Sequence, residues 1–151
     1  MGAYLTTLHL GVLDQPYDNE KKPMTTYQVA EFLEETYGIM QAWWDNHGEE
    51  VAEKMEVGVQ SAIDAVMENR RQANDPFGSA MNFAEHSFKN FLSSMEAERV
   101  GIPGTPTKAA LRGVWHRKKG YKAVIGPRRP SFIDSGMYEA NFQAWIDAWL
   151  K

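Results

Sequence analysis

Residues 25–71, TTYQVAEFLEETYGIMQAWWDNHGEEVAEKMEVGVQSAIDAVMENRR, decide the fold class. Apolar residues recur here every three or four positions, which is the spacing of one face of an α-helix. Thr25 or Thr26 is suited to cap the start, and Gln28 stands three positions after Thr25 as in a capping box. The polar run at 45–48 interrupts the pattern, and a glycine inside a helix costs about 1 kcal/mol relative to alanine. The stretch therefore predicts a long helix that is kinked or broken in two.

The residues before this stretch predict an extended arm. Residues 3–13 are apolar with partial alternation, which indicates a strand or a docked extended segment. Residues 14–23 are polar and include two prolines, so they link the arm to the helical body.

The residues after it predict shorter helices. Asn74-Asp75-Pro76 is a stop, and a helix is expected from about 77 to 99. After the breaker at 101–104, Thr105-Pro106 is expected to start a helix that reaches Arg117, with threonine as cap and proline in the first turn. A last helix is expected from about Asp134. Its aromatic residues fall at i, i+4, i+7 and i+11, on one helical face: Tyr138, Phe142, Trp145 and Trp149.

These segments together predict one mainly α-helical domain over residues 1–151. Its expected parts are the arm and linker (1–24), the helical body (25–100), a short helix with a basic loop that holds at most a short strand or hairpin (101–130), and a C-terminal helix (131–151).

Composition excludes several classes of protein. The chain of 151 residues is 43% hydrophobic and 24% charged, which is typical of a folded domain rather than a disordered one. No run approaches the roughly 18 apolar residues of a membrane-spanning helix, and the N-terminus does not resemble a secretory leader. The chain has no cysteine, so disulfides, thiolate chemistry and cysteine-bound zinc are excluded.

Charge is distributed unevenly along the chain. The stretch from Lys108 to Arg129 contains no acidic residue, whereas the rest of the chain holds 8 basic and 20 acidic residues. Opposite poles of this kind can pair within one molecule, pair between copies or meet a polyanion, and the further alternative is a solvated surface loop. The candidate basic loop, facing DNA or a neighbouring subunit, consists of Lys108, Arg112, Arg117, Lys118, Lys119, Lys122, Arg128 and Arg129.

Two further groups of residues are candidate contact surfaces. Four glutamates on consecutive helical turns form a candidate acidic partner face: Glu49, Glu50, Glu53 and Glu56. They are expected to be solvated or to meet a basic partner rather than to hold a cation. The four aromatic residues of the last expected helix, Tyr138, Phe142, Trp145 and Trp149, are either core or an interface, because an aromatic stripe must be covered.

Motifs of known catalytic or cofactor chemistry are absent from the sequence. It contains no Gly-rich phosphate loop, no G-x-G-x-x-G, no H-E-x-x-H and no G-x-S-x-G. The four histidines, at 9, 47, 86 and 116, lie far apart in the chain. We therefore expect no enzyme, no cofactor, no metal site and no small-molecule substrate. The alternative of an enzyme without a recognised motif would be supported only if Glu49, Glu53 and His47 converged in one pocket.

The C-terminal third carries the one resemblance to known proteins. It consists of GTPTKAALRGV (104–114), HRKK (116–119), PRRPSFIDSGMY (127–138) and EANFQAWID (139–147). This run resembles a segment of small structural proteins of long-tailed bacteriophages, and residues 130–138 are similar to an element of tail-completion proteins. The resemblance covers mainly residues 104–147.

The resemblance implies a virion structural protein that forms a ring at the head–tail neck or the tail end, as a connector or tail-completion component. Such a protein is made in the bacterial host cytoplasm and resides in the virion. Its partners would be itself, in six or twelve copies, neighbouring head, neck or tail proteins, and packaged DNA without sequence preference. The alternatives are a nucleic-acid-binding regulator that uses residues 105–129, and an assembly factor absent from the particle.

Overall fold

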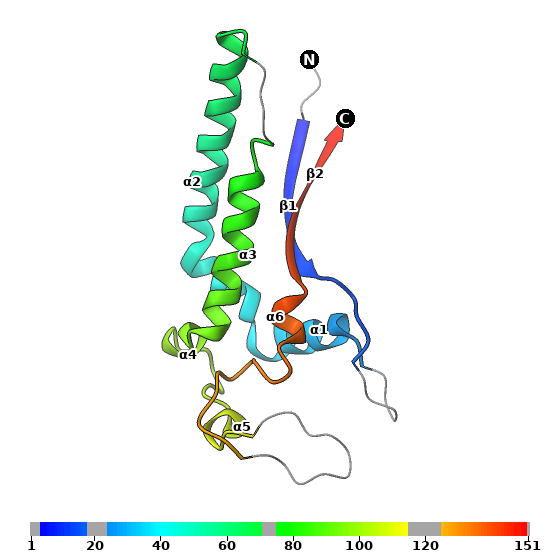
Figure 1. Ribbon diagram of the computed structural model, residues 1–151, viewed down its shortest axis with the longest axis vertical. Helices are drawn as coiled ribbons and strands as arrows, with labels where there is room; N and C mark the ends of the chain where they lie inside the picture. The colour runs from blue at the N-terminus through cyan, green and yellow to red at the C-terminus, as the bar shows by residue number, and fades with distance from the viewer. Residues whose placement is uncertain (1–3, 18–23, 71–74, 115–124, 151) are drawn as a thin grey trace.

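The protein consists mainly of helices, with one two-stranded antiparallel ribbon, which confirms the predicted mainly α fold (Figure 1). The computed structural model describes residues 4–17, 24–70, 75–114 and 125–150. The elements in chain order are β1 (Tyr4–Val12), α1 (Thr26–Tyr37), α2 (Ile39–Met67), α3 (Gly78–Ser93), α4 (Glu96–Arg99), α5 (Lys108–Leu111), α6 (Met137–Ala140) and β2 (Phe142–Leu150).

The helical body begins as the sequence predicts. Thr25 caps α1 in a capping box: its side chain accepts from the Gln28 backbone N–H, and the Gln28 side chain accepts from the Thr25 backbone N–H. α1 ends at Gly38, whose φ of 60° lies in the left-handed region that glycine adopts readily. The predicted division of the long helix is present, but its predicted position at residues 45–48 is wrong, because these residues lie inside the uninterrupted helix α2. The division falls at Gly38 instead.

Two glycines within α2 create space for close neighbours rather than ending the helix. A Cβ on Gly48 would lie 2.8 Å from the Trp44 ring, which folds over this position. A Cβ on Gly58 would lie 1.7 Å from the backbone oxygen of Pro76, just before α3. The second glycine lets the chain return close to α2, so that α3 runs antiparallel beside it (Figure 1).

The helix expected over residues 77–99 is divided in two. α3 ends at Ser93, and Met95 takes a left-handed φ of 62° before the single turn of α4. The turn places Ala97 in the core and brings Glu96 to His47, with 3.0 Å between Glu96 Oε1 and His47 Nε2. The chain thus turns at Met95, and the turn lets α4 contact the core and His47. The apolar spacing of residues 77–99 does not predict this turn.

The core is built from aromatic rings of three elements. Trp43 of α2 is fully buried and contacts Phe88 of α3 and Phe142 of β2 edge-on, at ring-centroid distances of 5.8 and 6.5 Å. Phe88 and Phe142 stack at 3.9 Å. The indole N–H of Trp43 donates to Ser87 Oγ over 3.0 Å, so the one polar atom of this side chain is satisfied.

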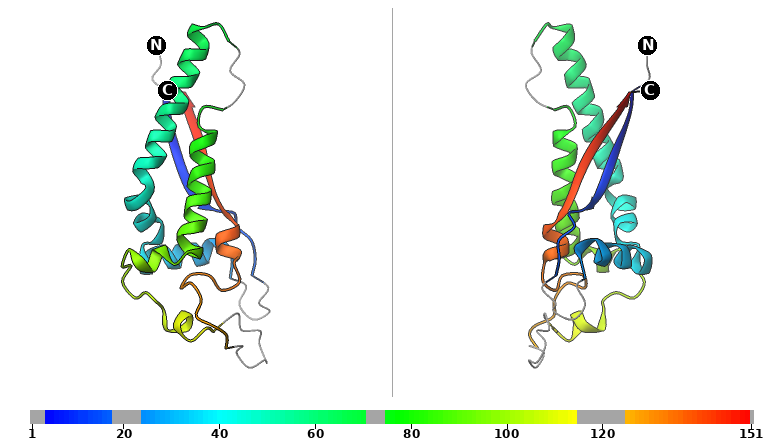
Figure 2. Two further views of the ribbon diagram at one scale, coloured as in Figure 1. Left: turned by 60° about the vertical axis from the view of Figure 1, so that its left-hand side comes forward. Right: turned by 90° about the vertical axis from the view of Figure 1, so that its right-hand side faces the viewer.

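The predicted C-terminal helix is wrong for most of its length. Of the expected range 131–151, only the single turn α6 is helical, and Phe142–Leu150 form strand β2. β2 pairs in antiparallel register with β1, from Val12↔Phe142 to Tyr4↔Leu150. The ribbon stands alongside the α2–α3 pair, with α3 packed against β2 (Figure 2). Of the two alternatives predicted for residues 3–13, a strand or a docked extended segment, the strand is present over Tyr4–Val12.

The pattern FQAWIDAWL fits a strand as well as a helix. Phe142 and Ala144 are buried in the core, whereas Gln143 and Trp145 are exposed on the opposite face of the ribbon. This alternation with period two competes with the helical spacing of the aromatic residues. A β1 strand without a partner would leave its backbone groups unpaired on both edges, and pairing with residues 142–150 satisfies those on one edge.

The helix expected from Thr105–Pro106 to Arg117 is also shorter than predicted. Thr107, not Thr105, is the N-cap, and its hydroxyl accepts from the Ala110 N–H. α5 ends at Leu111, because the chain turns at Gly113 to approach another backbone segment. A Cβ on Gly113 would lie 2.0 Å from the Gly126 oxygen, and the Gly126 N–H donates to the Gly113 oxygen.

Candidate functional site

The described part of the basic segment lies at one end of the molecule, at and beside α5 (Figure 1). Lys108 and Arg112 are exposed there. An isolated antiparallel bridge joins Val114 and Ile125, the described residues on either side of the basic loop. Four candidate residues fall at 115–124 and lie outside the described residues: Arg117, Lys118, Lys119 and Lys122.

Arg129 is buried, so its side chain is not exposed for the predicted contact with DNA or a neighbouring subunit. Its Nε donates to the Val114 oxygen over 2.7 Å, and its Nη1 donates to the oxygens of Pro130 and Ile133 over 3.0 and 2.6 Å. Asp134 lies 3.8 Å away as a charged partner. The guanidinium thus joins Val114, before the basic loop, to Pro130 and Ile133, after it, through hydrogen bonds.

Arg128 is half-exposed but is paired within the molecule. Its guanidinium donates to Glu98, whose side chain is almost fully buried. The same carboxylate accepts from the Ser131 N–H and hydroxyl over 3.0 and 2.6 Å. Of the basic residues in the described part of the segment, Lys108 and Arg112 are the exposed ones that form no salt bridge with another described residue.

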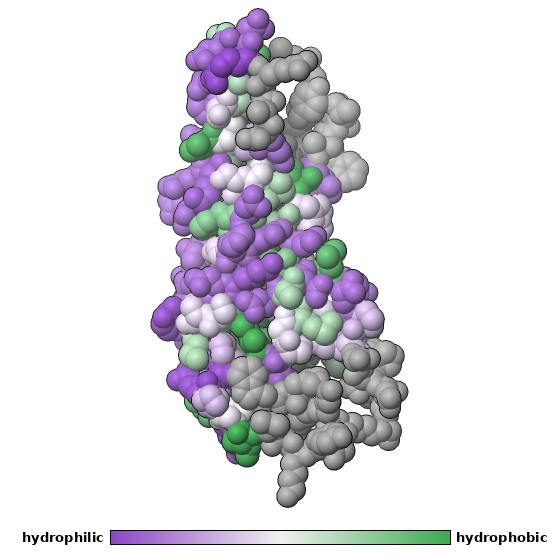
Figure 3. All heavy atoms as spheres, in the orientation of Figure 1, coloured by the Kyte–Doolittle hydropathy of each residue, from purple (hydrophilic) through white to green (hydrophobic). Residues whose placement is uncertain are grey.

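The acidic partner face is exposed along α2, as expected for a solvated face. The side chains of Glu49, Glu50, Glu53 and Glu56 all lie at the surface. Glu50 pairs with Lys54 one turn later over 3.3 Å. Figure 3 shows a face that is predominantly hydrophilic along the helical pair. Within the described ranges, no cluster of histidine and carboxylate side chains has the geometry of a metal site.

Glu49, Glu53 and His47, whose convergence in a pocket would have supported an enzyme, point in different directions. Glu49 and Glu53 point to solvent, whereas His47 is half-buried and bonds with Glu96. The His47 ring also lies 6.0 Å from Trp43 and 6.1 Å from Phe91, measured between ring centroids. His47 therefore connects α2 to α4 in the structure.

The aromatic residues of the C-terminal segment divide between core and surface. Tyr138 and Phe142 are buried. Trp145 is 44% exposed and stacks on His9 of β1 at a centroid distance of 5.3 Å. Trp149 lies in β2 opposite Leu5, and its side chain is outside the described part of the structure. They do not form one helical stripe, because the segment is mostly a strand.

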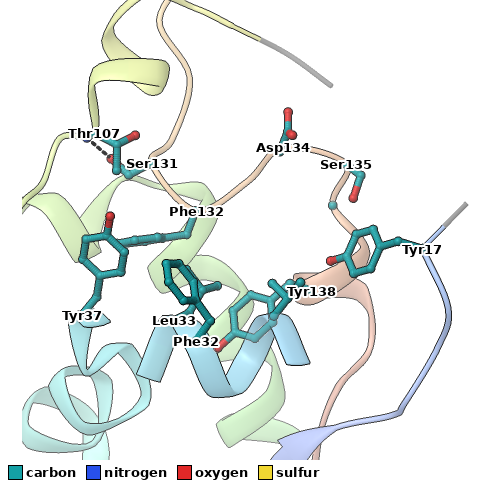
Figure 4. Close-up of a pocket in the computed structure, with 12 residues that line it drawn as sticks. Tyr17, Phe32, Leu33, Tyr37, Thr107, Ser131, Phe132, Asp134, Ser135 and Tyr138 are labelled. Carbon is teal, nitrogen blue, oxygen red and sulfur yellow. Dashed lines mark hydrogen bonds between the residues drawn. The ribbon is translucent and has the colours of Figure 1, made fainter. Parts of the chain in front are cut away.

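An aromatic pocket that the sequence did not indicate lies between α1 and the chain before α6 (Figure 4). Its volume is about 310 Å³. Its principal lining side chains come from four separate segments: Tyr17, Phe32, Tyr37, Thr107, Phe132 and Tyr138. Sequence spacing cannot bring these segments together, so only the fold reveals this pocket.

Tyr138 is the buried polar residue of this pocket. Its hydroxyl is buried and has no hydrogen-bond partner among the described residues. Burial raises the pKa of this hydroxyl well above its usual range, and the Glu34 carboxylate adds to the shift. Burial also raises the pKa of Tyr17, against a lowering hydrogen bond from Ser135.

We expect Tyr138→Phe to increase the free energy of unfolding at pH 7 by about 1 kcal/mol, because it removes an unsatisfied buried hydroxyl. The raised pKa means that the native state holds this proton more tightly than the unfolded state does. Wild-type stability is then lost as the pH rises above about 10, the unfolded value, and Tyr138→Phe flattens this alkaline decline. Urea titrations from pH 7 to 11 measure both effects.

The control variant is Tyr27→Phe, because the Tyr27 side chain is 55% exposed. It is expected to leave both the stability and the alkaline decline within about 0.5 kcal/mol of wild type. A Tyr138→Phe protein less stable than wild type at pH 7 would mean that the hydroxyl has a partner.

The C-terminal part of α2 exposes a strip of apolar residues. Val59, Ile63 and Val66 line a shallow depression with Met67 and Pro76, and the exposed fractions of Val66 and Met67 are 72% and 81%.

Within the described residues, no helix is long and apolar enough to span a membrane.

Comparison with known proteins gives no relative. No protein-family model matches the chain, and neither a curated protein nor a solved structure shows significant similarity to it.

Proposed function

We propose that this chain is a structural protein of a tailed-bacteriophage virion that forms a ring at the head–tail neck or the tail end, around the DNA path. The observation that carries the proposal is the separation of charge along an elongated molecule. Exposed carboxylates follow α2, and the exposed basic residues Lys108 and Arg112 lie at the α5 end.

Such a charge distribution suits contacts between different faces of successive copies. Cyclic rings use heterologous contacts, in which one surface of a copy meets another surface of the next. An acidic helix face opposite a basic end supplies complementary potentials for that contact, which orient the partners and suppress wrong pairings. The similarity of residues 104–147 to a segment of phage structural proteins points in the same direction.

The roles of the buried and paired arginines refine the proposal. Arg129 and Arg128 are engaged in holding the chain around the basic loop. We therefore expect Lys108, Arg112 and the basic residues at 117–122 to make the contacts with a neighbouring subunit or with DNA. A channel for DNA needs only such sequence-independent attraction of phosphates.

The proposal predicts that the chain is present in purified, DNA-filled virions at about six or twelve copies per particle. Quantitative mass spectrometry against the major capsid protein measures this number. Absence from the particle would overturn the proposal in favour of an assembly factor or a nucleic-acid-binding regulator. Binding of the isolated protein to DNA with a steep dependence on salt would distinguish the last two.

Two matched double variants test the proposed contact between the acidic face of α2 and the basic end of the next copy. Each variant is supplied in place of the wild-type protein during particle assembly, and its incorporation into particles is measured. Glu49→Lys with Glu53→Lys reverses two exposed charges on the acidic face of α2, and is expected to block incorporation into particles. Glu31→Lys with Glu35→Lys reverses two equally spaced, exposed charges on α1 and serves as the control. Equal incorporation of both double variants would exclude the acidic face as the contact.

A further inference from the structure

The outer edge of β1 offers unpaired backbone groups over most of its length. Two hydrogen bonds establish which groups face outward. The Leu13 N–H donates to the Asn141 oxygen, so odd-numbered residues of β1 bond to β2. The Ala144 N–H, opposite Leu10, donates away from the ribbon to Glu85 of α3. Because antiparallel pairing alternates, the even-numbered residues of β1 direct their N–H and C=O groups to its outer edge.

From Tyr4 to Leu10, no described residue forms a hydrogen bond to this outer edge. Among the described residues, no group outside the ribbon bonds to the main chain of Leu8 or Leu10. Near Val12 the strand ends, and the chain turns to α1, where the Thr26 hydroxyl donates to the Leu13 oxygen. β1 also lies on the side of β2 away from α3 (Figure 2).

β1 carries none of the features that protect a strand edge from pairing. The segment YLTTLHLGV contains no proline, no lysine and no acidic residue. Its register with β2 runs one-to-one over nine residues, without a bulge. Edges that stay unpaired in solution are usually short, charged, bulged or covered. A long edge without a bulge, proline, lysine or acidic residue is suited to strand addition.

We propose that a second copy of this chain pairs with this edge, β1 against β1 in antiparallel orientation, to form a four-stranded sheet in the order β2-β1-β1-β2. The open stretch is centred on Thr7. Pairing about that centre places Leu8 opposite Thr6 of the second copy and Leu10 opposite its Tyr4, with about eight new main-chain hydrogen bonds. Even residues then pair with even residues, so the core-facing sides of both ribbons lie on the same face of the sheet.

The second copy's β1 fits better than its β2. The outer edge of β2 is engaged by α3, through the bond of the Ala144 N–H to Glu85 Oε1 over 3.1 Å. A β1-to-β2 contact between copies would displace this bond and the helix beside it. The β1–β1 contact requires no such rearrangement, and it is symmetric. It is therefore distinct from the head-to-tail contact of a ring and does not rest on the proposed function.

Charge substitutions at Thr7 test the pairing, because Thr7 of each copy would face its equivalent at close range. Thr7 is exposed, so the variants are expected to fold. Thr7→Lys and Thr7→Glu place like charges opposite each other, and each is expected to raise the dimer dissociation constant on the order of fivefold. An equimolar mixture of the two variants is expected to restore wild-type dimerisation. Sedimentation equilibrium measures all three samples.

Gln143 supplies the matched control. It is exposed on the same face of the ribbon, but lies on β2, away from the proposed contact. Gln143→Lys is expected to leave the dissociation constant unchanged. Because the chain has no cysteine, Thr7→Cys provides an independent readout: oxidation should link two copies efficiently, whereas Gln143→Cys should not.

Two outcomes would overturn the pairing. One is a wild-type protein that stays monomeric at about 100 µM, a concentration at which weak protein pairs associate. The other is equal crosslinking of the two cysteine variants. Neither outcome depends on whether the chain is found in virions, so this inference and the proposed function fail separately.

Discussion

Replacing Trp43 by alanine is expected to lower the free energy of unfolding by about 3–5 kcal/mol. The side chain is fully buried where α2, α3 and β2 meet, and its ring contacts Phe88 and Phe142 edge-on. Truncation would leave a cavity between the helical pair and the ribbon, and it would remove the donor to Ser87 Oγ. Urea denaturation followed by far-ultraviolet circular dichroism measures the loss.

The neighbouring Trp44 gives the control for this experiment. It has the same side chain in the same helix, but is 40% exposed and lies over Gly48. Trp44→Ala is expected to cost about 1 kcal/mol. Trp43→Phe retains most of the ring and is expected to fall between the two alanine variants. Equal losses for Trp43→Ala and Trp44→Ala would contradict a core centred on Trp43.

The parts of the fold that the sequence predicts are those with local signals. The capping box at Thr25 and Gln28 depends on residues three positions apart, and the structure contains it. The long helix, the extended arm at 3–13 and the start of the helix near residue 77 follow from spacing and from breakers such as Pro76. In each case, the residues that decide the structure are neighbours in the chain.

The parts that the sequence does not predict depend on distant contacts. Residues 142–150 satisfy both the helical and the strand pattern, and the choice is made by β1, more than 130 positions earlier. Gly48 and Gly58 suggest breaks, but they make room for Trp44 and for the Pro76 oxygen. A glycine's role is fixed by what approaches it, which spacing in the sequence does not show.

The candidate site shows the same division. Charge counting finds the acidic face of α2 and the basic segment, because solvated charges need no partner from elsewhere. It assigns Arg129 the same role as Arg128, since the two are adjacent and chemically identical. Their different burial, and the pocket beside Tyr138, come from the way in which residues 125–138 fold back on α1 and α5.

Replacing Arg129 by methionine is expected to destabilise the region around α5 by about 3 kcal/mol. Methionine fills much of the same volume, but it donates no hydrogen bond. The oxygens of Val114, Pro130 and Ile133 would lose their donors inside the protein, and each unsatisfied buried oxygen carries a desolvation cost. Amide hydrogen exchange at Gly126, whose N–H donates to the Gly113 oxygen, reports on this region directly.

Arg128→Met provides the comparison that separates structure from binding. Arg128 is half-exposed, and Glu98 keeps two bonds from Ser131 when the arginine is removed. Its loss leaves the nearly buried Glu98 carboxylate with the Ser131 donors alone, and is expected to cost about 1–2 kcal/mol, less than the loss of Arg129, and to leave the exchange at Gly126 slow. If Arg129 instead contacted DNA or a neighbouring copy, Arg129→Met would be as stable as Arg128→Met and defective only in assembly. If exchange at Gly126 is faster in the isolated Arg129 variant and not in the Arg128 variant, then Arg129 stabilises the fold. A charged contact with DNA or a neighbouring copy is then expected at Lys108, Arg112 and the rest of the basic loop.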